Sequence, residues 1–448
     1  MIRKTLMAVG IAALAGAPAY AAEPAPAASS SAELQQIQQQ MRQLKAQYEQ
    51  QIQSLEQRLQ KVETAEQAPP PPPAPAASAG NAFNPKISLV MDGSYAHYSN
   101  HTPAVVPGYQ IGDDADQRRE GFSLGETELA VESNVDDQFH GWAALAVEPQ
   151  GGISVEEAFV NTTALPDGFA VKMGRFFSAI GYQNSQHAHV WDFADAPLVY
   201  RAMLGNQFAD DGVQLRWVAP TDVLLEFGSE LYHGGVFPGG GDHSNIGSYT
   251  VFSHLGSDIG DSGSWRIGLS QLRSTPHDRS DGATAPTEFT GKSALTILDG
   301  VYKWAPEGNT TVTNFVAQAE FFYRNEGGMM QYDPSGANDL SQYSGHQRGF
   351  YVQGVYQFMP RWRVGLRYDR LSSDNTLGNA VAGTPLATLA DNSSAPQRWS
   401  LMTDFSNSEF SRLRLQYNRD ESRPGEAPDN QVFLQYIFSL GSHPAHQF

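Results

Sequence analysis

The sequence predicts an all-β transmembrane barrel of about 16 antiparallel strands, preceded by a periplasmic α-helical coiled coil. Two observations predict the barrel: segments of about ten residues alternate apolar and polar side chains across residues 85–448, and long and short connections alternate between them. A third, heptad spacing of apolar residues in residues 33–63, predicts the coiled coil. No later segment has the run of about 18 apolar residues that a membrane helix needs, so membrane residence requires a closed barrel.

Residues 1–21 have the pattern of a secretory signal peptide. Arg3 and Lys4 precede the apolar run LMAVGIAALAG, and the motif AYA at residues 19–21 is a small-x-small cleavage site. A membrane anchor helix is the alternative, but it needs about 20 strongly apolar residues, and this run is shorter and rich in Ala and Gly. We therefore expect cleavage after Ala21 and export of the mature chain.

The charge balance of the chain is acidic. Lys and Arg number 29 against 48 Asp and Glu, which gives a formal net charge of -19 at pH 7. This charge argues against nucleic acid as a partner and against adhesion to anionic lipid through a basic surface. Cys is absent, so disulfides and thiolate metal sites are excluded. The H-E-x-x-H motif and the P-loop are also absent, and we expect no enzymatic activity and no cofactor.

Residues 33–63 are predicted to form a helix between two linkers, residues 22–32 and the Pro/Ala-rich residues 64–84, because Pro-rich flanks cannot continue a helix. The apolar positions recur at steps of three and four, as in a coiled coil; they are Leu34, Ile37, Met41, Leu44, Tyr48, Ile52, Leu55, Leu59 and Val62. A surface-bound amphipathic helix is the alternative, but such helices carry Lys and Arg on the polar face, and this one carries mostly Gln. The coiled coil predicts an oligomer.

Residues 85–448 are predicted to be the barrel. Alternate positions in each segment are apolar, as lipid-facing rows require, and the interleaved positions are polar or small. Among the predicted lipid-facing residues are Ile87, Leu89, Met91, Val213, Leu215, Trp217, Trp362 and Leu366. Short turns lie on the periplasmic side of such barrels and long loops lie outside. An even strand count returns the end of the chain to the side of the coiled coil.

Three motifs carry a resemblance to a known family: VEEAFVNTT at residues 155–163, FAVKMGRFFSAIGYQN at residues 169–184 and DGVQL at residues 211–215. With the arginine-bearing late strands, they make residues 81–448 resemble the phosphate-selective porin (O/P type) family of bacterial outer membranes. The resemblance implies a homotrimer of 16-stranded barrels in outer-membrane lipid. It also implies a third long loop, here residues 181–205, that folds inward and narrows the pore.

The polar positions of the strands place opposite charges on opposite walls of the predicted lumen. The expected pore-lining basic residues are Arg266, Arg363, Arg367, Arg398, Arg412 and Arg414. The expected pore-lining acidic residues are Glu126, Glu128, Glu132, Glu148, Glu226 and Glu230, with Asp92 and Glu157 at the same parity. Such a transverse field lets small ions of either sign pass, with selectivity set where the pore narrows. Arg363 and Arg367 are expected to face water inside the channel, or to be solvated beside nearby carboxylates.

The predicted constriction loop carries five charged or titratable residues: His187, His189, Asp192, Asp195 and Arg201. Imidazole and carboxylate groups suit zinc, so His187 and His189 are candidate ligands, although their spacing is not that of a structural zinc site. Solvated loop histidines are the alternative. The other three residues are expected to pin the loop to the barrel wall.

The function that these observations predict is passive diffusion of small hydrophilic solutes or ions, including anions such as phosphate, through an outer-membrane porin. Two alternatives stay open: a channel for divalent metal (zinc) uptake, and a barrel that anchors the coiled coil as a tether to the cell wall or partner proteins. We expect the coiled coil to lie in the periplasm in each case.

Overall fold

The computed structural model describes the barrel part of the chain, in the compact unit Asn81–Phe448. The described residues are 85–101, 106–112, 119–125, 127–147, 152–378, 385–423 and 425–441. The predicted signal peptide, linkers and coiled coil lie outside them, as do residues 442–448. Those predictions therefore stay predictions.

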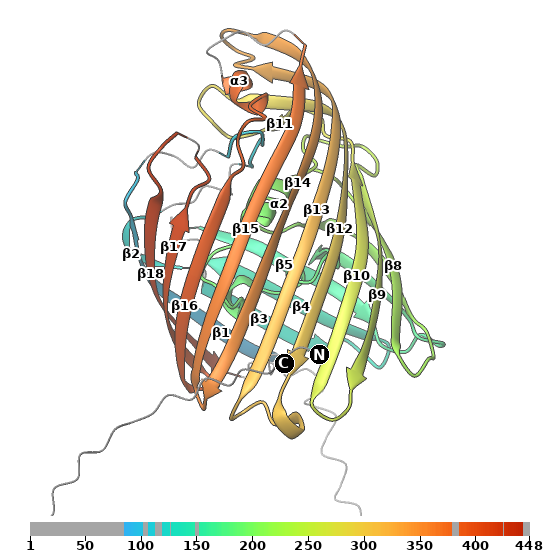
Figure 1. The fold of residues 1–448 in the computed structure, drawn as a ribbon. Coiled ribbons are helices and arrows are strands. Elements are labelled where there is room, and N and C mark those ends of the chain that lie inside the picture. Colours follow the sequence, from blue (N-terminus) through green and yellow to red (C-terminus); the bar gives the residue numbers. More distant parts are fainter. Residues whose placement is uncertain are drawn as a thin grey trace, which may run out of the picture. The chain divides into compact units, whose positions relative to one another are not determined.

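The described residues form a single closed antiparallel sheet (Figure 1). Its first nine strands are β1 Lys86–Tyr98, β2 Gly121–Leu124, β3 Thr127–Asn134, β4 Phe139–Val147, β5 Ile153–Thr162, β6 Phe169–Phe177, β7 Ala209–Val218, β8 Leu224–Tyr232 and β9 Ser248–Ile259. The remaining strands are β10 Gly263–Ser274, β11 Arg279–Ser280, β12 Thr287–Trp304, β13 Asn314–Tyr332, β14 Asp339–Met359, β15 Trp362–Leu377, β16 Gln397–Ser408, β17 Ser411–Asp420 and β18 Asp429–Gly441.

These segments make 16 barrel strands. β2 and β3 pair one after the other along β1, so together they are one barrel strand that is interrupted near Gly125. β11 is a two-residue strand beside β12, and β10 pairs directly with β12. The barrel closes where β1 pairs with β18 from Ser88 opposite Gly441. The predicted even count is confirmed, and β18 ends beside the start of β1.

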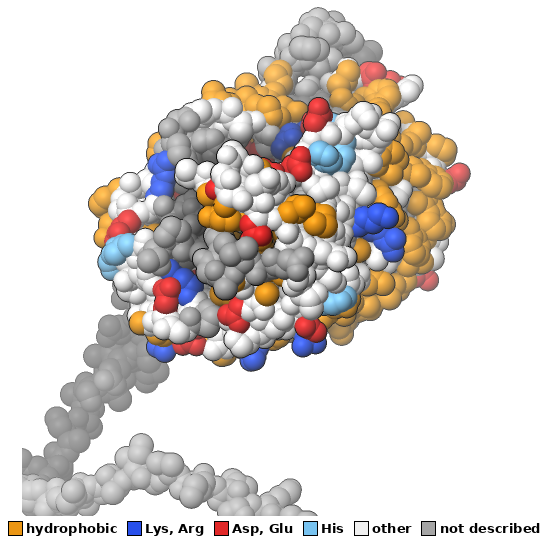
Figure 2. All heavy atoms as spheres, turned by 90° about the horizontal axis from the view of Figure 1, so that it is seen from above, with side chains coloured by type: hydrophobic (Ala, Val, Ile, Leu, Met, Phe, Trp, Pro, Cys, Tyr) orange, Lys and Arg blue, Asp and Glu red, His pale blue; other side chains and the backbone are white. Residues whose placement is uncertain are grey.

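The alternation of the sequence places apolar side chains on the outside of the sheet, because successive residues of a strand point to opposite faces. In β15, Leu366 is 51% exposed and Trp362 is 37% exposed. Arg367, which follows Leu366 and points to the opposite face, is 1% exposed. Figure 2 shows hydrophobic side chains gathered on the flank, while charged and polar side chains cover much of the end that carries the loops. The predicted faces of this strand are confirmed.

The helices are short segments of the connections: η3 Ala188–Val190, α2 Leu198–Leu204, η4 Pro306–Gly308 and α3 Pro385–Leu389. No helix in the described part of the chain combines the length and the apolar character needed to cross a membrane. Two of them, η3 and α2, belong to the connection between β6 and β7, residues 178–208, which we call the third loop. Figure 1 shows α2 within the ring of strands.

The main apolar core lies inside the barrel and is built around the third loop. Every residue of α2 is buried. Leu198, Val199 and Met203 of α2 cluster with barrel residues such as Phe322 and Tyr351. The third loop therefore folds into the barrel, as predicted for residues 181–205.

Candidate functional site

Two glycines near the ends of the third loop have backbone conformations that favour glycine. Gly181 has a φ of +69°, and a Cβ there would lie 2.4 Å from Oε2 of Glu320 on β13. Gly205 ends α2 in the left-handed conformation, with φ of 63°. Between these positions, Tyr200 donates a hydrogen bond to Glu320 at 2.9 Å, and the Gln183 N–H donates to the same carboxylate at 3.0 Å. The loop is thereby held against the inner wall.

The histidine side of the third loop meets the acidic wall. His187 Nδ1 lies 2.9 Å from Oε2 of Glu128 on β3 and 3.2 Å from Oε2 of Glu156 on β5. Its Nε2 lies 3.1 Å from Oε2 of Glu157. His189 Nδ1 lies 3.3 Å from the same Glu128 oxygen. We call these five residues the histidine–carboxylate cluster.

A β-bulge explains why two consecutive glutamates reach the cluster. On β4, Ala144 pairs with Glu157 and the next residue, Leu145, pairs with Val155, which leaves Glu156 as an extra residue. A bulge breaks the alternation of the strand, so both carboxylates contact the inward-facing His187. Glu156 was missed by the sequence analysis because strict alternation places it on the lipid face.

The charge state of His187 follows from its neighbours. Burial alone would lower the pKa of its imidazole, but the neighbouring carboxylates of Glu128, Glu156 and Glu157 outweigh burial and hold this pKa well above its usual value. The three carboxylates of the cluster therefore favour a positive charge at His187.

The aspartate side of the third loop meets the basic wall. Asp195 Oδ1 accepts a hydrogen bond from Arg367 Nη2 of β15 at 2.7 Å, and its Oδ2 accepts from Arg398 Nη1 of β16 at 2.7 Å. Gln416 and Asn418 of β17 donate to the same carboxylate at 2.7 and 2.9 Å. Burial would raise the pKa of Asp195, but the two guanidinium groups hold it at about 2.

Asp192 makes the second aspartate contact of the loop. Its Oδ1 accepts a hydrogen bond from Arg363 Nη1 of β15 at 2.8 Å. The same guanidinium forms a two-point contact with Asp404 of β16, from Nε at 3.0 Å and from Nη2 at 2.6 Å. A two-point contact of this kind fixes the plane of the guanidinium. The wall carboxylate thus orients the arginine toward the loop.

Four arginines of the basic wall also donate to main-chain oxygens of the third loop, since a guanidinium carries five donors in a fixed fork. The pairs are Arg367 with Asp195 at 2.8 Å, Arg398 with Ala196 at 2.7 Å, Arg414 with Trp191 at 2.7 Å and Arg412 with His189. The side chains of Arg367, Arg398 and Arg414 are at most 3% exposed. The expectation that Arg367 faces water is therefore wrong, because the loop covers it.

Comparison with known proteins gives one relative and several solved structures. No family model matches the chain. A protein of Aquifex aeolicus (strain VF5) described as uncharacterized is 30% identical over 397 residues, which cover 82% of this chain and 80% of that protein. The chain belongs to the same family as this Aquifex protein.

Among solved structures, a loop-deletion mutant of OmpT, an outer-membrane protein of Vibrio cholerae, has a TM-score of 0.51 at 11% identity over 80% of this chain and 99% of that chain. The outer-membrane channel DcaP of Acinetobacter baumannii has a TM-score of 0.48 at 14% identity over 80% of this chain and 96% of that chain. The likeness to the OmpT mutant shows a shared fold.

The remaining predicted basic residues lie away from the aspartate contacts. Arg266 of β10 donates at 3.2 Å to the Gly181 main-chain oxygen and at 3.2 Å to Asp299 of β12. Arg201 lies buried within α2. Arg266 therefore holds the start of the third loop to the wall.

The remaining predicted acidic residues have partners of their own on the wall. Glu230 of β8 accepts hydrogen bonds from Gln214 at 2.7 Å and from the Ala179 N–H at 3.0 Å. Glu226 pairs with His254 at 2.8 Å, and Glu132 pairs with Lys86 at 2.9 Å. Asp92 accepts from Gln435 at 2.6 Å. The predicted residues Glu126 and Glu148 lie outside the described residues.

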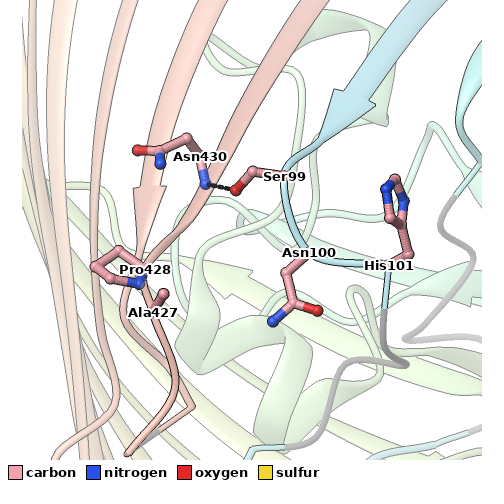
Figure 3. A pocket seen from close by; sticks show the side chains of 6 residues that line it. All are labelled: Ser99, Asn100, His101, Ala427, Pro428 and Asn430. Carbon is pink, nitrogen blue, oxygen red and sulfur yellow. Dashed lines mark hydrogen bonds between the residues drawn. The ribbon is translucent and has the colours of Figure 1, made fainter.

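A separate cavity of about 660 Å³ lies where β1 ends and β18 begins. It is lined by Ser99, Asn100, His101, Ala427, Pro428 and Asn430 (Figure 3). The Asn430 N–H donates to Ser99 Oγ at 2.7 Å, which joins the two sides of the closing strand pair. No third-loop residue lines this cavity, so it is separate from the third loop. The third loop with its two walls is the candidate functional site.

Proposed function

We propose that this chain is an outer-membrane porin for the passive diffusion of small hydrophilic solutes and ions. The closed barrel with an apolar outer face and a polar inner face supports this proposal, because a spanning sheet must satisfy its backbone groups between strands and meet lipid only with apolar side chains. The third loop would be the constriction.

One observation carries the proposal. The third loop meets opposite charge at each end: its histidines contact carboxylates of β3 and β5, and its aspartates contact guanidiniums of β15 and β16. The loop therefore crosses the inside of the barrel and is fastened by complementary charge, which suits a fixed steric filter. Selectivity is set where such a path is narrowest.

The burial of the arginines bears on the solute. Phosphate selectivity would need guanidiniums that are free to meet a passing anion, and Arg367, Arg398 and Arg414 already bind the third loop. We therefore propose weak ionic selectivity rather than a dedicated phosphate path. We further propose a homotrimer, because residues 33–63 carry the coiled-coil spacing.

The test is the reversal potential of the purified protein in a planar bilayer under a KCl gradient, repeated with phosphate added. We expect stepwise conductance with a reversal potential near zero and little effect of phosphate. Strong anion preference with block by phosphate would replace weak selectivity with the phosphate path. The absence of conductance steps from folded protein would overturn the porin proposal.

A further inference from the structure

We propose that Glu128, His187 and His189 form a binding site for a divalent transition-metal ion such as zinc, which fastens the third loop to the acidic wall. This inference goes beyond the porin proposal, because the site needs only the loop and the wall, not ion flow. It also places the metal as a resident ion of the loop, not as a transported solute.

The donor atoms have the separation that a small tetrahedral ion requires. Ligand atoms about 2.1 Å from a tetrahedral zinc ion lie roughly 3.4 Å from one another. Glu128 Oε2 lies 2.9 Å from His187 Nδ1 and 3.3 Å from His189 Nδ1. One donor atom from each of the three residues lies within 4.8 Å of the others. The two distances to Glu128 Oε2 therefore lie within about half an ångström of the tetrahedral separation.

The turn of the third loop points both imidazoles toward the same carboxylate. The Val190 N–H donates to the His187 main-chain oxygen at 3.0 Å, and Trp191 Nε1 donates to the Gln186 oxygen at 2.8 Å, which closes the turn around η3. The two imidazole centroids are 5.6 Å apart. Main-chain geometry therefore holds the ligands before any ion binds.

Carboxylate oxygens lie beside both ring nitrogens of His187. Glu157 lies at Nε2, and Glu128 and Glu156 lie at Nδ1. A cation held between Nδ1 and the oxygens of Glu128 and Glu156 would be attracted from both sides.

Glu128 presents one buried carboxylate oxygen to both imidazoles. Its residue is 4% exposed, and its Oε2 has no hydrogen-bond partner of acceptable geometry in the described part of the chain, although both Nδ1 atoms are near. A buried unsatisfied polar atom is costly. An ion held between the three atoms satisfies all of them at once.

The surroundings of the three ligands match those of known metal sites. A metal-binding histidine usually donates its second ring N–H to a carboxylate, which fixes its orientation, and Glu157 occupies that position for His187. Glu156 lies beside the same Nδ1 and supplies a further oxygen. Two imidazoles with carboxylate oxygens favour zinc and similar transition metals over Mg²⁺ and Ca²⁺, which prefer oxygen ligands alone.

The test is isothermal titration of zinc into the chelator-treated, detergent-solubilised full chain. We expect one zinc ion per chain in the wild type and loss of this binding in the double variant His187→Ala/His189→Ala. The matched control is His233→Ala/His243→Ala, which removes another loop pair with ring centroids 6.2 Å apart and no place in the cluster. The control variant should bind zinc as the wild type does, and Mg²⁺ should not compete.

A milder variant keeps the test decisive if the double variant fails to fold, as judged by circular dichroism. Glu157→Gln keeps the shape of the side chain and should weaken zinc binding by roughly 10- to 100-fold, because it removes the charge that orients His187. Zinc affinity unchanged in this variant and in Glu128→Gln, or no zinc binding by folded wild type, would overturn the proposal. The titration needs no bilayer, so its result is separate from whether the barrel conducts.

Discussion

The Asp195 carboxylate lies 2.7 Å from Arg367 Nη2, which joins two residues that are 172 positions apart in the sequence. Arg398 approaches the other oxygen of the same carboxylate, also at 2.7 Å. Asp195 is therefore the residue that most directly fixes the third loop to the basic wall.

Asp195→Asn should loosen the third loop. Removing one partner of a buried ion pair leaves the other charges uncompensated and costs roughly 3 kcal/mol of unfolding free energy, at the low end of the usual range because the aspartate is partly exposed. Arg367 and Arg398 would then meet solvent. We expect a larger single-channel conductance with a shift of the reversal potential toward anions, measured in planar bilayers.

The matched control for this variant is Asp222→Asn, in an exposed turn residue between β7 and β8. It makes the same chemical change away from the third loop and should leave conductance and ion preference unchanged. Equal conductance and ion preference in Asp195→Asn and the wild type would show that Asp195 does not hold the constriction.

The contribution of Asp195 should depend on pH in a defined window. Its pKa is about 2 in the folded chain, below the ordinary value of 3.8, so its stabilising effect is present above about pH 4 and is lost as the pH falls toward 2. A shift of this size corresponds to roughly 2 to 3 kcal/mol. We expect the difference in unfolding free energy between wild type and Asp195→Asn to be constant from pH 5 to pH 7, an interval above that window, and to shrink below it. A difference that grows on acidification would contradict this assignment.

The two faces of the barrel can be tested with single cysteines, because the natural chain has none. A cysteine at Leu366 should react with a membrane-soluble reagent and not with a charged maleimide, since this position is exposed on the outer face. A cysteine at Ser94, on the inner face two residues beyond the buried Asp92, should show the opposite preference. Reversed labelling would mean that the strand register is shifted by one residue.

Removal of residues 33–63 separates the channel from the tether. If diffusion through the barrel is the function, the deleted chain should keep the single-step conductance of the wild type, because the barrel closes through β1 and β18 without these residues. Loss of the proposed trimer, measured by mass in detergent, is expected at the same time. Unchanged trimer mass would remove the coiled coil as the cause of assembly.

The sequence predicts the barrel well because the strands follow a local rule. Lipid outside and polar groups inside impose alternation on each segment, so the faces of Leu366 and Arg367 can be assigned from their order alone. The inward course of the third loop came from the family resemblance, and the structure agrees with it. The partners of that loop depend on contacts between distant residues, such as Asp192 with Arg363, which no local pattern specifies.

Two parts of the site could not be predicted for physical reasons. Arg367 is covered because it donates a hydrogen bond to the main chain of the third loop. This bond depends on where the loop backbone lies, and the sequence contains no signal for it. Glu156 was absent from the predicted pore-lining residues because a bulge changes parity without a marker residue such as glycine at that position. Two adjacent glutamates in a barrel strand were the available signal, since one of them would otherwise face lipid.

The extra residue at Glu156 gives a spacing rule for relatives of this chain. Val155 and Glu157 pair with Leu145 and Ala144, and Glu156 is the extra residue between them. A homologue that lacks this extra residue would return its strand to strict alternation and could present only one of the two carboxylates to the loop. Relatives that keep His-Ala-His in the third loop should therefore also keep the length of this segment. An alignment can reveal that joint retention before any protein is purified.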